Sequence, residues 1–173
     1  MSGAVRFDPY ALLAALERHR VGYVLIGGFA RVIQGTEELT DGLDLAPSTR
    51  PDNLRRLDLA LAELEAERVD RKPLALGDEQ ALQAEPIVEL RTSRGELRLV
   101  PEPAGTRGGY DDLRRRAQRL PLGQGLWPRV ATIADLARMA AALSREQDLQ
   151  PLQQLRTLAE LERSRNRGRT LER

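Results

Sequence analysis

Two glycines and an aspartate that could bind a phosphate group and its metal ion lie in the stretch Tyr23–Pro47. An apolar run, Val24–Ile26, ends at Gly27-Gly28, and a later apolar run carries Asp44 in its middle. The pattern predicts a strand, a glycine turn, a short helix and a second strand with an acidic residue. Free backbone N–H groups at a helix N-terminus bind phosphate, and a neighbouring carboxylate can hold Mg²⁺. This stretch therefore indicates phosphate and metal binding.

The scarcity of nucleophiles and metal ligands excludes several other chemistries. The chain has no cysteine, which removes disulfides, thiolate catalysis and cysteine-based zinc sites. His19, the one histidine, falls at the end of an expected helix, where a solvated residue favoured by the helix dipole is the simpler interpretation. With one histidine and no cysteine, the sequence gives little support for Ser/His/Asp or Cys/His catalysis. Lys72 is the only lysine, so the usual point-charge binder of a triphosphate is nearly absent.

The composition predicts one soluble domain over residues 1–162 and an arginine-rich, flexible tail over residues 163–173. Hydrophobic residues make up 41% and charged residues 31% of the chain, a balance typical of globular proteins. No apolar run approaches the ~20 residues that cross a bilayer, and the N-terminus lacks the apolar region of a signal peptide. We therefore expect a cytoplasmic protein without membrane partners. The net charge of +1 and the 3% aromatic content give no strong signature of nucleic-acid binding.

Helices and strands alternate in the N-terminal half. Apolar residues at helical spacing predict helices over residues 8–20, 29–34 and 51–66. Asp8 precedes a proline, and a cap residue followed by proline is typical of a helix start. Strands are expected at residues 23–26 and 43–46, and we expect them to be neighbours in one sheet.

The C-terminal half combines a hairpin with further helices. Residues 67–85 predict a loop with one helical turn at Glu79–Gln83. Strands Ile87–Thr92 and Glu96–Val100, joined by a tight turn, should form an antiparallel hairpin, with Glu96 and Arg98 on one face of the second strand.

Three more segments complete the prediction. Residues 110–119 predict a helix, and Leu122–Val130 a loop or an irregular short strand. Thr132 should cap the next helix, with Asp135 at its third position, and a last helix starts near residue 148. The fold class is therefore α+β, a small mixed β-sheet flanked by helices.

Three stretches resemble small bacterial nucleotidyltransferase-fold proteins, the group that includes AbiEii-type toxins and other toxin–antitoxin nucleotidyltransferases. The similar stretches are Tyr23–Asn53, Leu90–Tyr110 and Val130–Leu149. The resemblance implies a nucleotidyltransferase-like α+β fold. It also implies that Gly27 and Gly28 hold a triphosphate through their backbone. The alternative, that the two glycines only make a strand-to-helix turn, is equally compatible with the sequence.

The acidic motif of this family departs from its usual pattern here. The family pattern is close to G-x-x-R-x-T-x-D-x-D, and the corresponding stretch is Gly35–Asp44. Thr40 matches and is implied to bind the nucleotide, and Asp44 matches the second aspartate, implied to be catalytic and to bind metal. Glu38 replaces the arginine, and Gly42 replaces the first aspartate. Two aspartates two residues apart clamp the metal ions of a triphosphate, so one carboxylate of that clamp is missing.

Asp41 is a poor replacement for the missing carboxylate. It lies three residues from Asp44, and odd spacing in a strand directs two side chains to opposite faces. A bulge at Gly42 is the alternative that would re-aim it toward Asp44.

A third family carboxylate is replaced by a residue of opposite charge. In the family it lies in a strand of the form G-x-L-D-L, where this chain has Arg98. A late Met-Lys pair of the family is Met139-Ala140 here. If the strands pair as in the family, Arg98 faces the pocket, and we expect it to pair with Asp44 directly or through one water. The residues expected to line this pocket are Glu38, Asp41, Gly42 and Arg98.

The sequence is compatible with two functions, of which we favour the first. In the first, the chain is a nucleotidyltransferase-fold protein that has lost most metal- and NTP-binding residues. It acts without a cofactor, by binding a nucleotide, an RNA or a cognate toxin or antitoxin protein. The second is an active, divergent nucleotidyltransferase that uses Mg²⁺ to move a nucleotide from an NTP onto RNA or protein. Its rebuilt site would draw on Asp41, Asp44, Glu38 and Glu96, with Arg98 or Arg145 in place of the missing lysine. A structural or regulatory domain without a nucleotide is a third interpretation.

Overall fold

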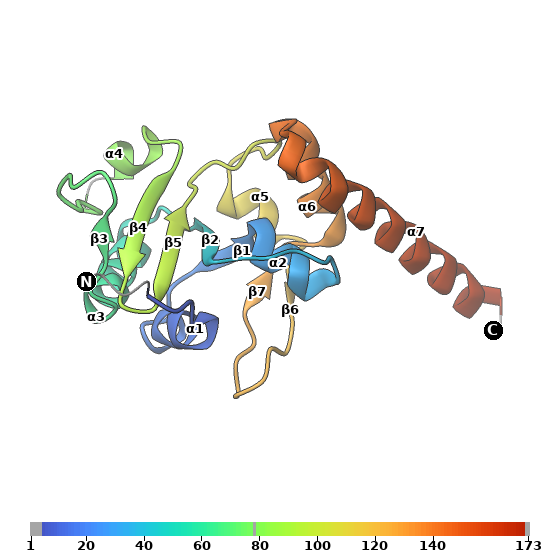
Figure 1. Cartoon of the computed structure of the whole chain (residues 1–173), viewed down its shortest axis with the longest axis horizontal. Coiled ribbons are helices and arrows are strands. Elements are labelled where there is room, and N and C mark those ends of the chain that lie inside the picture. The colour runs from blue at the N-terminus through green and yellow to red at the C-terminus, as the bar shows by residue number, and fades with distance from the viewer. Residues whose placement is uncertain (1–4, 78, 172–173) are drawn as a thin grey trace.

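A mixed sheet of seven strands forms the centre of the computed structural model, which describes residues 5–77 and 79–171 (Figure 1). The strands are β1 (Tyr23–Ile26), β2 (Gly42–Pro47), β3 (Glu67–Arg68), β4 (Val88–Thr92), β5 (Gly95–Leu99), β6 (Gln118–Arg119) and β7 (Arg129–Val130). The helices are α1 (Pro9–Arg18), α2 (Gly27–Gln34), α3 (Pro51–Glu63), α4 (Glu79–Gln83), α5 (Tyr110–Arg114), α6 (Ile133–Leu143) and α7 (Leu149–Leu171), with a 3₁₀ turn at Glu146–Asp148.

The strands that carry the glycine turn and the acidic residue lie in the middle of this sheet. The strand order is β3-β4-β5-β2-β1-β7-β6. β1 pairs antiparallel with β2 and parallel with β7, whereas β2 runs parallel to β5. β4 and β5 form the expected antiparallel hairpin. The predicted neighbours, the hairpin and the α+β class with a mixed sheet flanked by helices are therefore confirmed.

Side-chain caps fix the starts of two helices as predicted. The Oδ1 atom of Asp8 accepts a hydrogen bond of 3.0 Å from the backbone N–H of Ala11, at the start of α1. The Oγ1 atom of Thr132 accepts one of 3.1 Å from the backbone N–H of Asp135, at the start of α6. Each cap satisfies a backbone donor that has no partner within its helix.

Several element boundaries differ from the prediction. Helix α2 begins directly at Gly27 rather than at Phe29, so no loop separates it from β1. Helix α5 ends at Arg114 rather than at residue 119, because residues 118 and 119 leave it to pair with β7 as strand β6. Residues 67–68, expected in a loop, form β3 and pair with β4. The last two errors concern the two-residue strands β6 and β3, which are too short to show an alternating pattern.

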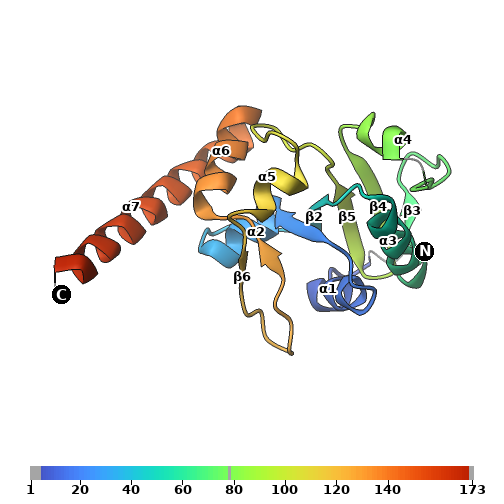
Figure 2. The same ribbon diagram turned by 180° about the vertical axis from the view of Figure 1, so that it is seen from behind.

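Asn53 connects helix α3 to the ends of two central strands. Its Oδ1 atom accepts a hydrogen bond of 2.6 Å from the Gly22 N–H, and its Nδ2 atom donates to the carbonyl oxygens of Gly22 (2.9 Å) and Ser48 (2.8 Å). Gly22 precedes β1 and Ser48 follows β2, so one buried amide holds both strand ends against α3. Helix α3 also packs against α1, and both lie toward the β3–β5 end of the sheet (Figure 2).

A network of arginines and aspartates joins α5 to α6. Asp135, which is buried, accepts hydrogen bonds of 3.0 and 3.1 Å from Arg116 and lies 3.0 Å from a nitrogen of Arg138. Asp112 lies 3.2 Å from Arg116 and 3.0 Å from Arg138. The carboxylate of Asp135 therefore binds these arginines instead of accepting the reciprocal hydrogen bond of a capping box from the N–H of Thr132. Helix α6 in turn packs against α2 and α7.

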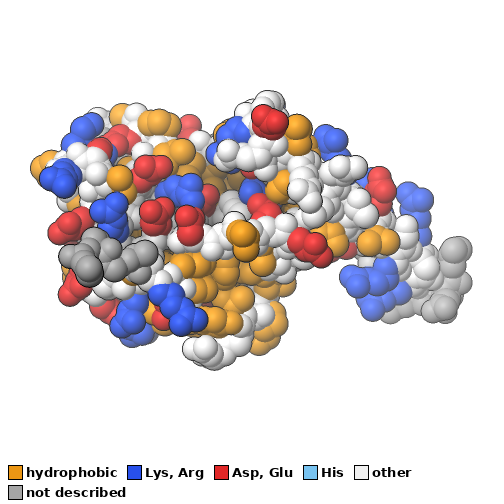
Figure 3. All heavy atoms as spheres, viewed as in Figure 1, with side chains coloured by type: hydrophobic (Ala, Val, Ile, Leu, Met, Phe, Trp, Pro, Cys, Tyr) orange, Lys and Arg blue, Asp and Glu red, His pale blue; other side chains and the backbone are white. Residues whose placement is uncertain are grey.

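Helix α7 packs against the rest of the protein at its beginning and projects from it at its end (Figure 1). Leu152 and Leu155 are buried, whereas the side chains of residues 160–169 are all exposed, and basic side chains stand out on this projection (Figure 3). The expected boundary between residues 162 and 163 falls inside this continuous helix. The arginine-rich segment is helical as far as Leu171. Its flexibility stays a prediction, and residues 172–173 lie outside the described residues.

The described ranges contain no helix that is both long enough and apolar enough to cross a lipid bilayer. Helix α7 has the length but carries charged residues along it.

Removing the Asn53 amide should destabilise the fold. In Asn53→Ala, backbone groups of Gly22 and Ser48 lose their partners inside the protein, which should lower the free energy of unfolding by about 2–4 kcal/mol. Urea unfolding measures this change. Asp58→Ala, at an exposed position of the same helix, is the matched control and should change stability by less than about 0.5 kcal/mol. Equal effects of the two substitutions would contradict the role of Asn53.

Candidate functional site

An open cavity of about 400 Å³ lies beside the central strands β2 and β5. Its walls come from α2, from the segment that leads into β2, from β5 and from the residues around the start of α7. It is lined by the sequence-predicted residues Gly28, Glu38, Thr40, Asp41, Gly42, Asp44 and Arg98. Gly27 lines a smaller cavity of about 120 Å³, which shares Gly28, Asp44 and Arg98 with the larger one. The fold thus brings the predicted residues to one place.

Asp44 and Arg98 form the ion pair that the sequence led us to expect, and the contact is direct. The two residues are in register on the parallel strands β2 and β5. The Nε atom of Arg98 lies 2.9 Å from the Oδ1 atom of Asp44. Neither atom has a well-directed hydrogen bond, although both are buried. The contact is therefore close and electrostatic, without the alignment that would make it a strong bidentate pair.

Burial raises the pKa of the Asp44 carboxyl above its ordinary value of 3.8. The positive charge of Arg98 opposes this shift most strongly, followed by the charges of Arg31 and Arg145, whereas Asp41 adds to it. The loss of hydration thus outweighs the attraction of the nearby arginines. Asp44 is held in a place where its charged form is costly, and the arginines reduce that cost.

The Asp44 carboxylate lies directly against the glycine turn. A Cβ atom at Gly27 would come within 2.3 Å of the Oδ2 atom of Asp44, and Gly27 has a φ of +70°, a left-handed conformation that favours glycine. The turn that the resemblance assigns to a triphosphate is therefore in contact with a negative group. At Gly28, a Cβ atom would come within 3.0 Å of the Thr40 methyl group. Thr40 thus packs on the second glycine.

Gly42 leaves no room for a side chain at the position of the missing aspartate. A Cβ atom there would lie 2.7 Å from the carbonyl oxygen of Glu96, its register partner on β5. Because that oxygen belongs to the backbone of a paired strand, it cannot move aside cheaply. At the position that the resemblance assigns to the first aspartate, the two strands therefore lie too close to admit a side chain without a shift.

Glu38, at the position that the resemblance assigns to an arginine, is paired with an arginine that sequence reasoning missed. Its oxygens accept hydrogen bonds of 2.7–3.1 Å from the side chain of Arg31, and Oε2 also accepts one of 2.7 Å from the Thr36 hydroxyl. Arg31 lies 3.6 Å from Asp148, which pairs in turn with Arg145. The charge reversal at position 38 has its counterpart in Arg31, seven residues earlier in the chain.

Asp41 lines the cavity as expected, whereas Glu96, a second candidate for a rebuilt site, does not. Asp41 precedes β2, so strand alternation does not govern its direction, and it lines the same cavity as Asp44. Its Oδ1 atom lies 3.9 Å from a nitrogen of Arg98, and its side chain is exposed. Glu96 is also exposed and does not contribute to the described lining of the cavity. Of these two candidates for a rebuilt site, only Asp41 lies beside Asp44.

Met139 and Ala140, at the place of the family's Met-Lys pair, line the smaller cavity. Leu136 and Leu143 of the same helix also line it, together with Asp44 and Arg98. The position that the resemblance assigns to the family lysine therefore faces this site, but Ala140 presents a methyl group there. Arg145, which lines both cavities, is a nearby cation and is paired with Asp148.

The groups around Asp44 do not match the ligands of a divalent metal ion. Mg²⁺ requires octahedral oxygen ligation, whereas Asp44 faces a guanidinium and Gly42 offers no side chain. In the described parts of the chain, no group of three or more His, Cys, Asp or Glu side chains is arranged to hold a metal. The arrangement can therefore hold charged groups in fixed pairs, but it lacks the clamp of the two-aspartate motif.

Comparison with known proteins supports the fold. No model of a known protein family matches the chain, and no curated protein sequence matches it. Among solved structures, the solution structure of the antibiotic-resistance factor ANT(2'')-Ia, an aminoglycoside nucleotidyltransferase, is similar. The two share 13% sequence identity with a TM-score of 0.54, over 94% of this chain and 93% of the other. The chain therefore has a nucleotidyltransferase-like fold, and its likeness to AbiEii-type proteins stays a prediction.

Removing the cation beside Asp44 should make stability more dependent on pH. In Arg98→Met the pKa of Asp44 rises further, because burial remains and the closest positive charge is lost. When a carboxyl has a higher pKa in the folded than in the unfolded protein, its protonation stabilises the fold. This stabilisation is fully present below the unfolded-state pKa and is lost as pH rises through the folded-state pKa. The variant should therefore lose about 1–3 kcal/mol relative to wild type at pH 7 and less at pH 4.

Chemical unfolding of wild type and Arg98→Met across this pH range measures the difference. Adding Asp44→Asn to both proteins is the control and should abolish the pH dependence of the difference. A loss that is the same at pH 4 and pH 7 would contradict the coupling of the two residues.

A side chain at position 42 should disturb the pairing of β2 with β5. Gly42→Ala places a methyl group against the Glu96 carbonyl, so we expect a loss of about 1–3 kcal/mol in unfolding free energy. Gly168→Ala is the control, because a Cβ there meets nothing within 4 Å and alanine favours a helix. Thermal unfolding compares the two. A Gly42→Ala protein as stable as wild type would show that the strands can separate to admit an aspartate.

Proposed function

We propose that this protein is a nucleotidyltransferase-fold protein that does not carry out metal-dependent nucleotide transfer and acts by binding. The observation that supports this most strongly is the direct contact of Arg98 with Asp44. The family resemblance gives a carboxylate at the position of Arg98, so a fixed cation takes the side of Asp44 that a metal ion would need. A metal would have to displace this tethered charge and also lose its own hydration water.

The charges of the cavity support binding without a nucleoside triphosphate. Its lining contains three arginines, Arg31, Arg98 and Arg145, and each lies within 4 Å of a carboxylate. Five carboxylates line the same cavity: Glu37, Glu38, Asp41, Asp44 and Asp148. A triphosphate would therefore meet an excess of negative charge, and it would find the glycine turn already covered by Asp44.

The excess of carboxylates favours a protein partner over RNA. Basic side chains of a partner would complement this cavity, whereas the phosphates of RNA would be repelled by it. A protein of the toxin–antitoxin kind that the resemblance implies is therefore the partner that we propose for this surface. The preference for a protein over RNA rests on the carboxylates around Asp44. It does not involve the arginine-rich end of α7, which lies apart from this cavity.

An active, divergent nucleotidyltransferase is the second candidate, and one observation favours it. Asp41 lines the same cavity as Asp44, so two carboxylates do share the site. Arg98 lies within 3.9 Å of both and would have to leave before they could share a metal ion.

Incubation with each labelled NTP, Mg²⁺ or Mn²⁺ and total RNA or protein tests the proposed function. We expect no transferred label, and calorimetry with millimolar Mg-ATP and Mg-GTP should give little heat of binding. Label transfer, or tight metal-dependent binding, that disappears in Asp44→Ala would establish the active enzyme instead.

A gain-of-function variant tests whether Arg98 is what excludes the metal. Arg98→Asp places a second carboxylate in register with Asp44, so we expect it to bind Mn²⁺ at millimolar concentrations where wild type does not. Arg98→Asn removes the positive charge without adding a carboxylate and is the matched control. Isothermal titration measures binding in all three proteins. Equal Mn²⁺ binding by wild type and Arg98→Asp would remove this explanation.

A further inference from the structure

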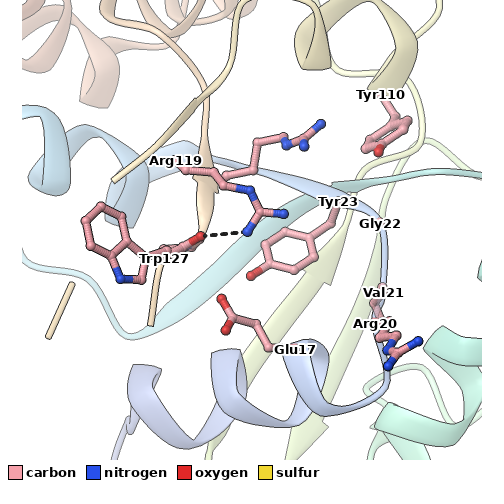
Figure 4. A pocket seen from close by; sticks show the side chains of 10 residues that line it. Glu17, Arg20, Val21, Gly22, Tyr23, Tyr110, Arg119 and Trp127 are labelled. Carbon is pink, nitrogen blue, oxygen red and sulfur yellow. Dashed lines mark hydrogen bonds between the residues drawn. The ribbon is translucent and has the colours of Figure 1, made fainter. Parts of the chain in front are cut away.

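A third cavity, of about 330 Å³, opens at the other end of β1 from the Asp44–Arg98 pair (Figure 4). Tyr23 begins β1 at this cavity, whereas Gly27 follows the last residue of β1 at the opposite end. The walls come from α1 and the turn after it, from α5 and from the β6–β7 hairpin. No described residue lines both this cavity and the cavities at Asp44.

The hydroxyl of Tyr23 lies in the wall of this cavity without a partner. The residue is 6% exposed, and its hydroxyl is buried and makes no hydrogen bond within the described part of the chain. Figure 4 shows the hydroxyl directed between Glu17 and Arg119. Buried polar groups in native proteins almost always have a partner. Burial also raises the pKa of Tyr23 well above its usual value, so the hydroxyl stays protonated and available as a donor.

Positive charge dominates the surroundings of this hydroxyl. Arg20, Arg119 and Arg129 line the cavity, and Glu17 is the one acidic residue among the described lining. Arg119 contacts the backbone oxygen of Trp127 at 3.5 Å, and within the described ranges neither Arg119 nor Arg129 forms an ion pair. Guanidinium groups without a carboxylate partner are well suited to phosphate, which they bind through two parallel hydrogen bonds.

The remaining walls suit a ligand that is larger than a bare anion. The volume lies at the lower end of the range for small-molecule pockets and exceeds what one phosphate would fill. Glu17 can accept a hydrogen bond from a hydroxyl or amino group. Trp127, which is 50% exposed, is also among the residues that line the cavity.

We propose that this cavity binds a small phosphomonoester. The phosphate lies on Arg119 and Arg129 and accepts a hydrogen bond from the Tyr23 hydroxyl, and a hydroxyl or amino group on the rest of the ligand donates to Glu17. Arg119 is exposed, so its side chain can turn from Trp127 to a ligand that lies beside the Tyr23 hydroxyl. The binding needs no metal ion. It is independent of the function proposed for the Asp44 cavity, because the two places share no described residue.

Trp127 provides a direct measurement, because it is the only tryptophan of the chain and lines this cavity. Its fluorescence should change saturably with ribose 5-phosphate and with adenosine 5′-monophosphate, more weakly with inorganic phosphate, and not with ribose. Saturation by the nucleotide alone would narrow the ligand class to nucleotides and still support the proposal. No saturable change with either phosphomonoester would overturn it. Inorganic phosphate binding as tightly as the esters would also overturn it, by showing a bare anion site.

Substitutions distinguish specific binding through Tyr23 and Arg119 from nonspecific binding in a surface groove. Tyr23→Phe should weaken binding of the phosphomonoester about tenfold, the effect of one lost hydrogen bond to a charged group. It should leave the unfolding temperature unchanged or higher, because the hydroxyl that it removes has no partner. Arg119→Met should weaken binding at least tenfold.

Two further variants are the controls. Arg115→Met, at an exposed arginine that lines neither cavity, and Arg98→Asp, at the Asp44 cavity, should both bind the phosphomonoester as wild type does. Wild-type affinity in both Tyr23→Phe and Arg119→Met would contradict the proposal. Loss of affinity in Arg98→Asp would do the same, because it would place the ligand at the other end of β1.

Discussion

The candidate site depends on keeping one carboxylate charged in a place where it is only partly hydrated. Asp44 lies on a central strand, and its pKa is raised by burial in spite of three nearby arginines. Such a group requires a positive neighbour. In a nucleotidyltransferase with its full set of aspartates the neighbour is a metal ion, which can leave. Here it is Arg98, which is held in register by the backbone ladder between β2 and β5 and stays with the chain.

The glycines on both sides of Asp44 follow from this arrangement. At Gly27 a side chain would collide with the Asp44 carboxylate, and at Gly42 one would collide with the backbone of β5. Both positions therefore need glycine for reasons of packing alone. Because packing alone requires Gly27, a Gly-Gly turn is insufficient evidence for a bound triphosphate. The distance from the turn to the nearest carboxylate is the more informative observation.

The sequence predicted those parts of the structure that follow from local patterns. Alternation in the β4–β5 hairpin and the caps at Asp8 and Thr132 gave correct elements, and the parallel pairing of β2 with β5 made Arg98 the partner of Asp44. Contacts between segments were less accessible. Glu38 lies in a loop and Arg31 in helix α2, so the hydrophobic pattern of the sequence gives no sign that the two side chains pair. Asp41 lines the cavity as expected. The alternation argument that directed it away from Asp44 does not apply, because alternation holds only within a strand and this residue lies just before one.

Helix α7 is stabilised by packing at its beginning but only by its own backbone hydrogen bonds at its end. Its beginning is held by Leu152 and Leu155, which are part of the protein interior, whereas residues 160–169 have no apolar face against anything. An isolated helical segment of about this length is marginal in water, since only its own backbone hydrogen bonds maintain it. The outer turns should therefore lose helical structure gradually on warming, as a slope in the circular dichroism signal that precedes the cooperative unfolding of the sheet. Amide protons along these turns should exchange with solvent long before those of the buried turns.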